Sequence, residues 1–389
     1  KELLMMKKAS LVTKYFSSAP KRRVFAPLVR IGIFPLVHCS ISTRGLTADA
    51  LKQEDQTCVE RSLDVAILGA PNAGKSTLLN LLVGGKVSAV SPKRNTTRES
   101  VVGILSDTKE KVQIVFHDTP GYVDYRAAGR FVRELHVGAR EAVGPVDRCL
   151  VLVDAARRFD AGARRDFEAL IDNCIVAERP VAVVLNKADL VHPKPRLLLT
   201  ADALWRALEG CQERQAGAVV RGEDPGEGAG RGLKECNSAD KGSRFDLTEE
   251  AEFFMISAGK NDGVDDVKSY LFSHAYEREW EYEEDVITEF DEEELVSEII
   301  REQIYRRFHK EVPYRVEQFT RDLKVSEDHS FIRINQELIV PNDSQRKIII
   351  GNNGNSLKAV MAAARNEIKR ALGCGEVIIN ISVKATKKK

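Results

Sequence analysis

A glycine-rich loop near residue 70 has the residue types and spacing needed to bind the phosphates of a nucleotide. GAPNAGKS, at residues 69–76, fits the pattern GxxxxGK[ST] and follows an apolar run that ends at Leu68. In such a loop backbone amides point at phosphate, the lysine reaches the terminal phosphates, and the final hydroxyl ligates magnesium. We therefore expect nucleotide contacts from Gly69, Ala70, Pro71, Asn72, Ala73, Gly74, Lys75, Ser76 and Thr77.

A second polar motif, DTPG at residues 118–121, follows the apolar run 112–116. A carboxylate there can hold magnesium through water, and the glycine amide can sense a γ-phosphate. The motif adds Asp118, Thr119, Pro120 and Gly121 to the predicted site, with Asp118 as a metal ligand beside Ser76.

A third motif, NKAD at residues 186–189, selects the base. Its aspartate offers a carboxylate to two donors on the edge of guanine, and adenine lacks that pair of donors. Ser257 and Ala258 follow a later apolar run and supply backbone amides near the guanine oxygen. We therefore expect Asn186, Lys187, Asp189, Ser257 and Ala258 to bind guanine, which makes GTP or GDP the predicted ligand.

The stretch Asn95–Arg98 lies between the first loop and the next apolar run, where a switch segment places a threonine on magnesium. Thr96 and Thr97 both fit, and we take Thr97 as the ligand. The alternative is a loop with two β-branched residues and no role.

Short apolar runs alternate with helical stretches from Leu63 onward, which indicates a mostly parallel sheet with helices on both faces. The predicted strands are 65–68, 101–105, 112–116, 150–153, 181–185 and 253–256. Each of the last four ends at a polar loop, which is where an open parallel sheet places its ligand. The fold class is thus an α/β P-loop domain over residues 60–275, with a charged, glycine-rich insertion at 210–246 that we expect to be irregular.

An acidic run at 276–294 predicts a solvated linker, and a second domain follows at 295–389. Val296, Ile300, Ile304 and Phe308 recur every four residues and predict a helix. Strands are predicted at 314–319 and 331–340, two helices on either side of GNNG at 351–354, and a last strand near 377–383. This order describes a small α+β domain, and it carries 18 Lys or Arg against 11 Asp or Glu.

The GNNG turn between two helices of a basic domain resembles the GXXG loop of a type II KH domain, which clamps single-stranded RNA. Candidate RNA contacts are Gly351, Asn352, Asn353, Gly354, Lys358 and Arg365. Many such loops carry a basic residue between the glycines, whereas this one has two asparagines, so charge must come from neighbours. Lys358, Arg365 and Lys369 share one helical stripe, which could also be an ordinary solvated face.

Net charge is only +1, because acidic and basic segments cancel. Residues 1–48 hold nine Lys or Arg and a single acid, Glu2, together with serines and scattered apolar residues. This composition is typical of a mitochondrial transit segment; a basic tail that contacts nucleic acid is the alternative. No apolar run reaches the ~18 residues that would span a bilayer. The seven cysteines form no CxxC pair, so neither a zinc site nor a disulfide framework is expected.

Together GxPNxGKS, TTR, DTPG, NKAD and the Ser257–Ala258 pair resemble the Era family of GTPases over about residues 60–385. The stretches 284–288, 297–302 and 313–314 are similar to that family's linker and first KH helix. With the basic N-terminus, the resemblance implies a mitochondrial member that hydrolyses GTP with magnesium. It also implies small-subunit ribosomal RNA and the small ribosomal subunit as partners, a matrix location and a monomer, and it leaves a peripheral inner-membrane contact open.

The resemblance also bears on catalysis, for which we take Lys75, Asn72, Thr97 and Gly121 as the candidate residues. Ras-type GTPases place a glutamine directly after DxxG, but this chain has Tyr122, so slow intrinsic hydrolysis is expected. Asn72 resembles the asparagine that helps bind potassium in related GTPases, although it could be only a turn residue. A function of another class stays open: an RNA-binding scaffold in which the nucleotide only stabilises the fold.

Overall fold

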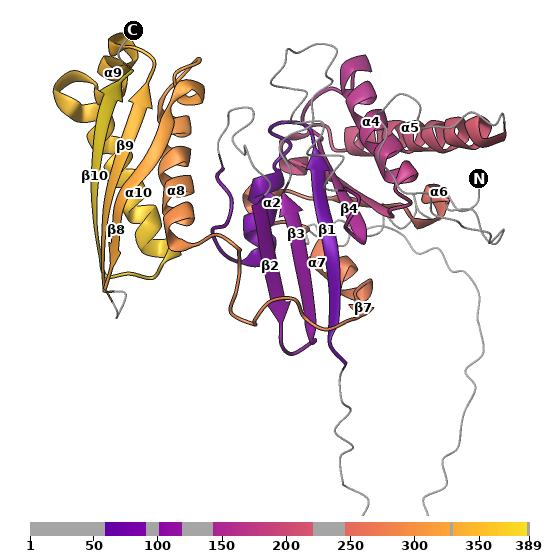
Figure 1. The fold of residues 1–389 in the computed structure, drawn as a ribbon. Coiled ribbons are helices and arrows are strands. Elements are labelled where there is room, and N and C mark those ends of the chain that lie inside the picture. Colours follow the sequence, from indigo (N-terminus) through magenta and orange to yellow (C-terminus); the bar gives the residue numbers. More distant parts are fainter. Residues whose placement is uncertain (1–58, 91–100, 119–142, 221–245, 327–329, 387–389) are drawn as a thin grey trace, which may run out of the picture. The chain divides into compact units, whose positions relative to one another are not determined.

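A mostly parallel sheet organises the first part of the structure (Figure 1), a computed structural model that describes residues 59–90, 101–118, 143–220, 246–326 and 330–386. Its main path follows the order β2-β3-β1-β4-β5-β6, and all neighbours along it except β2 and β3 are parallel. All six predicted strands are present: β1 (Arg61–Gly69), β2 (Val101–Asp107), β3 (Val112–Asp118), β4 (Arg148–Asp154), β5 (Val181–Asn186) and β6 (Glu252–Met255).

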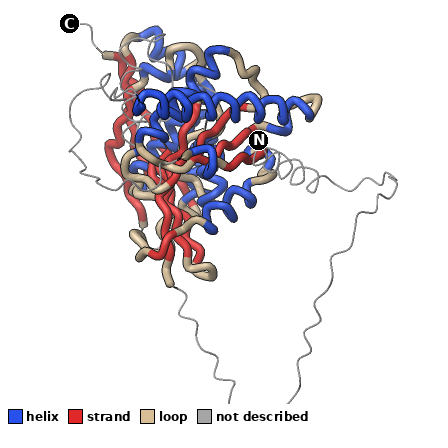
Figure 2. Tube along the Cα trace, turned by 90° about the vertical axis from the view of Figure 1, so that its right-hand side faces the viewer, coloured by secondary structure: helices blue, strands red, loops and turns tan. Residues whose placement is uncertain are grey.

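Helices cover both faces of this sheet, as predicted (Figures 1 and 2). Apolar side chains of α2 (Lys75–Val83) and α7 (Val264–Ser273) share one core with alternate residues of β1, such as Leu63 and Val65. Helices α4 (Ala161–Val176) and α5 (Pro195–Val220) pack against each other on the opposite side. A short helix, α6 (Leu247–Glu250), leads into β6. Because β3, β1, β4 and β5 are parallel, the carboxyl ends of β1, β3 and β5 meet at one edge of the sheet.

The insertion predicted at 210–246 begins as regular structure, because α5 continues through Val220. The expectation of an irregular segment is wrong for residues 210–220. In this stretch Cys211 is buried against α4, where its thiol lies 3.8 Å from the Glu168 carbonyl oxygen. This packing extends the helix into a region whose charge and glycine content suggested a loop. Residues 221–245 lie outside the described part of the chain.

The acidic linker is attached along the sheet by hydrogen bonds, while most of its residues are exposed, as expected of a solvated segment. Its first residues form β7 (Tyr276–Glu277), which pairs antiparallel with the start of β1. The Arg278 guanidinium lies 2.9 Å from Asp64 Oδ2 and 2.8 Å from Asp147 Oδ2. Farther along, the Ile104 amide donates to the Ile287 carbonyl over 2.9 Å. Long-range hydrogen bonds therefore fix this acidic segment.

The linker also ends earlier than predicted, because α8 (Glu292–Arg307) already includes the last three acidic residues. Asp291 caps this helix in a capping box with Glu294. Acidic side chains in a first turn are favoured by the helix dipole. Part of the acidic run is thus the start of a helix.

The second domain has the predicted order helix, strand, strand, helix, helix, strand, which is the fold of a type II KH domain. After α8 come β8 (Glu317–Val325), β9 (Phe331–Val340), α9 (Asp343–Ile350), α10 (Asn355–Ala371) and β10 (Glu376–Ala385). The sheet order is β10-β9-β8, with β9 and β10 parallel and β8 antiparallel to β9. One strand begins later than predicted, because residues 313–315 form a short 3₁₀ helix that opens with Pro313.

One core lies between the three helices and one face of this sheet. Val296, Ile300 and Ile304 of α8 and Phe308 directly after it belong to this core, as their spacing predicted. Val360, Ala364 and Ile368 of α10 are also buried there, so the opposite stripe of α10 is free for other contacts. Phe290, just before α8, packs partly buried against this core and against that of the first domain.

Candidate functional site

The glycine-rich loop forms a backbone cradle between β1 and α2. Gly69 and Gly74 have φ values of 147° and 102°, and a Cβ at Gly74 would lie 2.2 Å from Asn186 Nδ2. Helix α2 starts directly after Gly74 with no side-chain cap, so its first amides are available to an anion. The Lys75 ammonium donates to the Gly69 carbonyl over 3.1 Å and is buried. This geometry suits a phosphate group.

Two hydroxyls converge on one carboxylate beside the cradle. Ser76 Oγ donates to Asp118 Oδ2 over 2.8 Å, and Ser88 Oγ donates to the same oxygen over 3.0 Å. Asp118 is fully buried at the end of β3, and its other oxygen, Oδ1, is buried without a hydrogen-bond partner among the described residues. Buried polar atoms normally have partners, so the free oxygen fits a ligand such as a metal-bound water. The predicted pair Ser76 and Asp118 is thus brought together.

Burial shifts the pKa values of the two charged groups in this pocket toward their neutral forms. It lowers the pKa of Lys75, which attraction to Asp118 partly opposes. It raises the pKa of the Asp118 carboxyl, against the effects of Lys75, Ser76 and Ser88. An anion at Lys75 and a cation near Asp118 would restore both charged forms. The residues therefore fit a magnesium ion that is bound together with the nucleotide. Among the described residues, no cluster of three or more His, Cys, Asp or Glu could bind a metal by itself.

The loop that is predicted to recognise the base follows β5. Asn186 joins this loop to the cradle: its Nδ2 donates to the Ala73 carbonyl over 2.8 Å, while its Oδ1 accepts from the Ala258 amide over 2.9 Å. The Lys187 ammonium reaches the Asn72 carbonyl over 2.7 Å. Asn186 is therefore a positioning residue in this structure, and its contacts hold two predicted motifs against each other.

Asp189 is oriented by its neighbours on the adjacent loop. Ser257 Oγ donates to Asp189 Oδ1 over 2.7 Å, and Lys260 Nζ lies 3.6 Å from Oδ2. The Ser257 hydrogen bond lowers the pKa of the Asp189 carboxyl, and Lys260 adds to the effect. The carboxylate thus stays ionised and can accept from the two donors on a guanine edge.

Three polar residues of the site were missed from sequence. Ser88 lies in a loop that belongs to no motif, yet it binds Asp118. Asp154 ends β4, and its carboxylate accepts from Lys187 Nζ over 2.6 Å. A polar residue at the end of a central strand was a usable signal for Asp154. No comparable signal marks Ser88 or Lys260.

Several predicted residues cannot be placed. Thr96 and Thr97, and the remainder of DTPG with Tyr122, lie outside the described residues; the DTPG positions concerned are Thr119, Pro120 and Gly121. Asn72 is described and has a φ of 65°, in the left-handed region that asparagine tolerates in turns. A turn role for Asn72 is thus supported, and its relation to potassium stays a prediction.

The GNNG turn presents strained backbone to the solvent. Gly351 has φ 73° and ψ 176°, which only glycine adopts easily, and Gly354 has φ 76°. A Cβ at Gly351 would lie 2.4 Å from Ser356 Oγ. Asn352 and Asn353 are exposed, and Asn353 is left-handed with φ 52°. The turn therefore leaves room for a backbone to approach the start of α10.

The side chains around the turn provide charge and one apolar contact. Lys358, Arg365 and Lys369 are all exposed on α10, as their spacing predicted. Ile348 lies on α9 just before the turn with a relative exposure of 51%, and sequence reasoning did not select it. The combination suits a ligand with a phosphate backbone and apolar base faces.

Comparison with known proteins gives consistent matches. A family model described as 50S ribosome-binding GTPase matches residues 64–187. The mitochondrial GTPase Era of Danio rerio is 33% identical over 356 residues, which cover 87% of this chain and 78% of the relative. GTPase Era of Sinorhizobium medicae is 35% identical over 312 residues, covering 80% and 84%.

Solved structures agree with these relatives. The crystal structure of Era in complex with MgGDPNP and nucleotides 1506–1542 of 16S ribosomal RNA matches with a TM-score of 0.65 and 27% identity, covering 84% of this chain and 94% of that one. A point variant of Aquifex aeolicus Era bound to GDP.AlF4⁻ also gives a TM-score of 0.65, at 28% identity and with the same coverage of the two chains. From the sequence relatives and the shared two-part fold, this chain belongs to the Era family of GTPases and is a GTP-hydrolysing enzyme.

Proposed function

We propose that the chain couples GTP binding and hydrolysis to the binding of small-subunit ribosomal RNA, with residues 60–275 as the GTPase domain and 295–389 as the RNA-binding domain. The observation that carries the first half is the buried Asp118 next to Ser76 and Lys75, whose Oδ1 has no hydrogen-bond partner in the part of the chain that the structure describes. The exposed GNNG turn at the head of the basic α10 supports the second half.

In this proposal each residue of the nucleotide pocket has a defined part in binding GTP. Amides after Gly74 and the Lys75 ammonium bind the phosphates, while Ser76 and Asp118 hold magnesium, Ser76 directly and Asp118 through water. Bound magnesium neutralises charge that develops on the phosphates. Asp189, held ionised by Ser257, accepts from guanine. Thr97 and Gly121 complete the site in this proposal.

Potassium is a further part of the proposal, with Asn72 helping to bind it near the phosphates. A cation there would supply the charge of an arginine finger. Asn72 is exposed at the rim of the cradle, where an incoming ion could reach it. GTP turnover should then be faster in potassium than in sodium, and the difference should disappear in Asn72→Ala. Equal rates of the wild type in the two salts would refute this part.

RNA binding is assigned to the GNNG turn and to Lys358 and Arg365. Glycine allows close approach of the RNA backbone, and the head of α10 favours phosphate. The Era crystal structure with 16S ribosomal RNA supports a ribosomal partner. A synthetic RNA with the sequence of nucleotides 1506–1542 of 16S ribosomal RNA, called the probe RNA below, is therefore a suitable ligand for tests.

We place the protein in the mitochondrial matrix, as a monomer that assists assembly of the small mitochondrial ribosomal subunit. The mitochondrial Era relative and the basic residues 1–48 support this location. Among the described residues, none of the helices combines the length and apolar character needed to cross a membrane. Any inner-membrane association would thus be peripheral for this part, and a carbonate wash of mitochondria should release it.

Single-turnover GTP hydrolysis by the full chain, with and without the probe RNA, tests the proposed coupling. We expect slow hydrolysis alone and a clear acceleration by the RNA. An RNA that binds without changing hydrolysis would favour a scaffold in which the nucleotide only stabilises the fold. Crosslinking in cells tests the partner, because fragments derived mainly from messenger or transfer RNA would contradict a role in ribosome assembly.

A further inference from the structure

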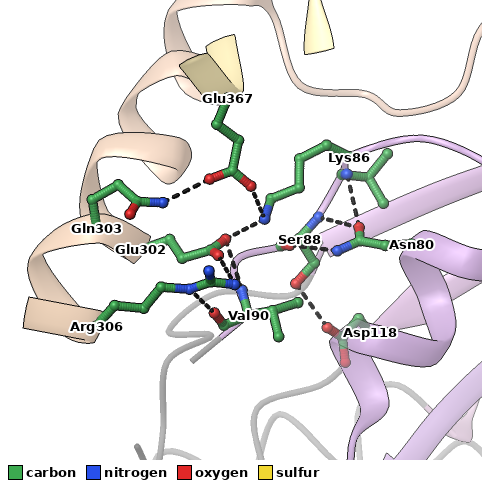
Figure 3. Close-up of polar contacts among 10 residues, drawn as sticks. Asn80, Lys86, Ser88, Val90, Asp118, Glu302, Gln303, Arg306 and Glu367 are labelled. Atoms are coloured by element: carbon green, nitrogen blue, oxygen red, sulfur yellow. Dashed lines mark hydrogen bonds and ion pairs between the residues drawn. The ribbon is translucent and has the colours of Figure 1, made fainter. Parts of the chain in front are cut away.

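A buried carboxylate of the KH domain binds the loop that follows α2. Glu302, on α8, is fully buried and pairs with Lys86 of that loop and with Arg306 one helical turn away. The same carboxylate accepts from the Val90 amide over 2.9 Å, and Arg306 Nε donates to the Val90 carbonyl over 3.1 Å. Figure 3 shows these contacts converging on both ends of the segment Lys86–Val90.

The middle of the same segment is fixed to the nucleotide site. Asn80, on α2, accepts from the Val87 and Ser88 amides and donates to the Ser88 carbonyl, over 2.8–2.9 Å. These bonds aim Ser88 Oγ at Asp118, 3.0 Å away (Figure 3). Ser88, which binds Asp118, is thus two positions along the chain from Lys86 and from Val90, the residues that Glu302 contacts.

A second KH helix joins this cluster. Glu367, on α10, lies 2.8 Å from Lys86 Nζ and accepts from Gln303 over 2.6 Å. The GNNG turn directly precedes α10, so Glu367 lies 12 residues into the same helix as the proposed RNA clamp. At 1.5 Å per residue this is about 18 Å along a rigid element. A displacement of the turn would therefore also displace Glu367.

The cluster is charge-balanced, with Lys86 and Arg306 facing Glu302 and Glu367; the Glu302 carboxylate is fully buried, whereas Arg306 is exposed and the other two side chains are partly exposed. Removal of Lys86 takes a cationic partner from this buried carboxylate, so the remaining groups must move or admit water. Small shifts also matter at the other end, because misplacement of a reacting group by about 1 Å can cost 100-fold in rate. The segment is thus suited to transmit movement in both directions.

We propose that the segment Lys86–Val90 carries the coupling between RNA at the GNNG turn and magnesium–GTP. Glu302 binds both of its ends, Glu367 adds a contact at Lys86, and Ser88 in its middle binds Asp118. Ser88 is a positioning residue for Asp118, and Glu302 positions Ser88. This inference rests on the proposed function and names the residues through which it works.

The test uses the full chain as wild type, Lys86→Met, Glu302→Gln and Lys86→Arg. Arg206→Met is the matched control, because Arg206 forms an exposed ion pair with Asp202 on α5, away from both sites. Two quantities are measured for each protein. One is the ratio of probe-RNA affinities with magnesium–GDPNP and with magnesium–GDP, and the other is the magnesium concentration that half-saturates GTP hydrolysis. Thermal melting identifies variants that fail to fold.

We expect Lys86→Met and Glu302→Gln to bring the affinity ratio to within about twofold of one, from a wild-type value of at least fivefold. They should also raise the half-saturating magnesium concentration, whereas Lys86→Arg and Arg206→Met should behave as the wild type. If Lys86→Met and Glu302→Gln both fold and both keep the wild-type ratio of RNA affinities, the inference is wrong but the proposed function still stands. A wild type without nucleotide-dependent RNA binding overturns the inference and the proposed function together. If Glu302→Gln does not fold, the result for Lys86→Met tests the inference by itself. The Lys86 side chain is partly exposed, so we expect this variant to fold.

Discussion

In the nucleotide pocket Lys75, Asp118 and Asn186 are buried and held by hydrogen bonds from neighbouring motifs, whereas at the GNNG turn Asn352 and Asn353 are exposed. The first region is organised before a ligand arrives, because parallel strand ends place its groups together. The second depends on the backbone of two glycines and on exposed charged side chains. Substitutions in the pocket should therefore have large effects on GTP binding and hydrolysis. Substitutions near the turn should have smaller, salt-dependent effects on RNA binding.

The largest effect is expected for Lys75→Met. Removal of the buried ammonium takes away charge next to the phosphates, where no other described cation contacts the cradle carbonyls of Gly69 and Ala70. Single-turnover GTP hydrolysis should fall by about 100-fold or more. Probe-RNA affinity without nucleotide should stay unchanged, and a parallel loss of RNA binding would show that the two regions are not separable in this way.

Asp189→Asn should change the preferred base. The amide cannot accept from both guanine donors, but it can donate to the carbonyl that xanthine carries in place of the amino group. GDP affinity should fall about 100-fold, while the affinity for the xanthine nucleotide should rise. Fluorescence titration with both nucleotides measures this exchange. A variant that still prefers GDP would mean that Asp189 does not contact the base.

Gly354→Asp should act on the exposed region alone. An aspartate at a φ of 76° is strained, and its charge repels a phosphate at the head of α10. Probe-RNA affinity should fall by about 10-fold. GTP hydrolysis without RNA is the control, and we expect it to match the wild type. Undiminished RNA binding would exclude the turn as the clamp.

Lys358→Ala and Arg365→Ala should each weaken RNA binding by a few fold. Both side chains are exposed, so their contribution is electrostatic and screened by salt. Each substitution should reduce the slope of log affinity against log salt by about one. Asn366→Ala, on an exposed position of the same helix, is the neutral control. Unchanged slopes would make the basic stripe an ordinary solvated face.

The smallest effect is expected for Ser257→Ala, and only in acid. Loss of the Ser257 hydrogen bond raises the pKa of the Asp189 carboxyl toward its ordinary value. A carboxyl with a higher pKa protonates earlier as the pH falls, so the variant should lose GDP affinity at a higher pH than the wild type. GDP titrations between about pH 6 and pH 3 compare the two proteins, because this range includes the ordinary aspartate pKa of about 3.9 and the values below it. Identical profiles would mean that the hydroxyl does not tune Asp189.

Much of the nucleotide pocket could be predicted because Lys75, Asp118 and Asn186 follow short apolar strands, and parallel strand ends converge. Ser88 could not, since its role depends on hydrogen bonds with Asn80 that no local pattern encodes. The attachment of the linker to the sheet could not be predicted for the same reason. Asp64 and Asp147, which bind Arg278 of the linker, lie far from it in the sequence. The charge of the linker alone therefore does not indicate that the segment is bound.

Local preference also gave way to tertiary packing elsewhere. Tyr314 has a strand-like neighbourhood, but it lies in a 3₁₀ helix, where its ring packs edge-on against Tyr305 at 5.2 Å. The KH domain was easier, because Val296, Ile300 and Ile304 repeat at a helical period around one core. The contact of the KH domain with the GTPase domain through Glu302 could not be predicted, because a glutamate on an amphipathic helix is expected to be exposed to solvent.

The central claim is that the nucleotide state controls RNA binding, and the dissociation constant of the probe RNA tests it most directly. It should be measured for the full wild-type chain, once saturated with magnesium–GDPNP and once with magnesium–GDP, at the same salt concentration. We predict that the two dissociation constants differ by at least about fivefold. Equal values would contradict the account and leave an RNA-binding scaffold whose nucleotide serves only its stability.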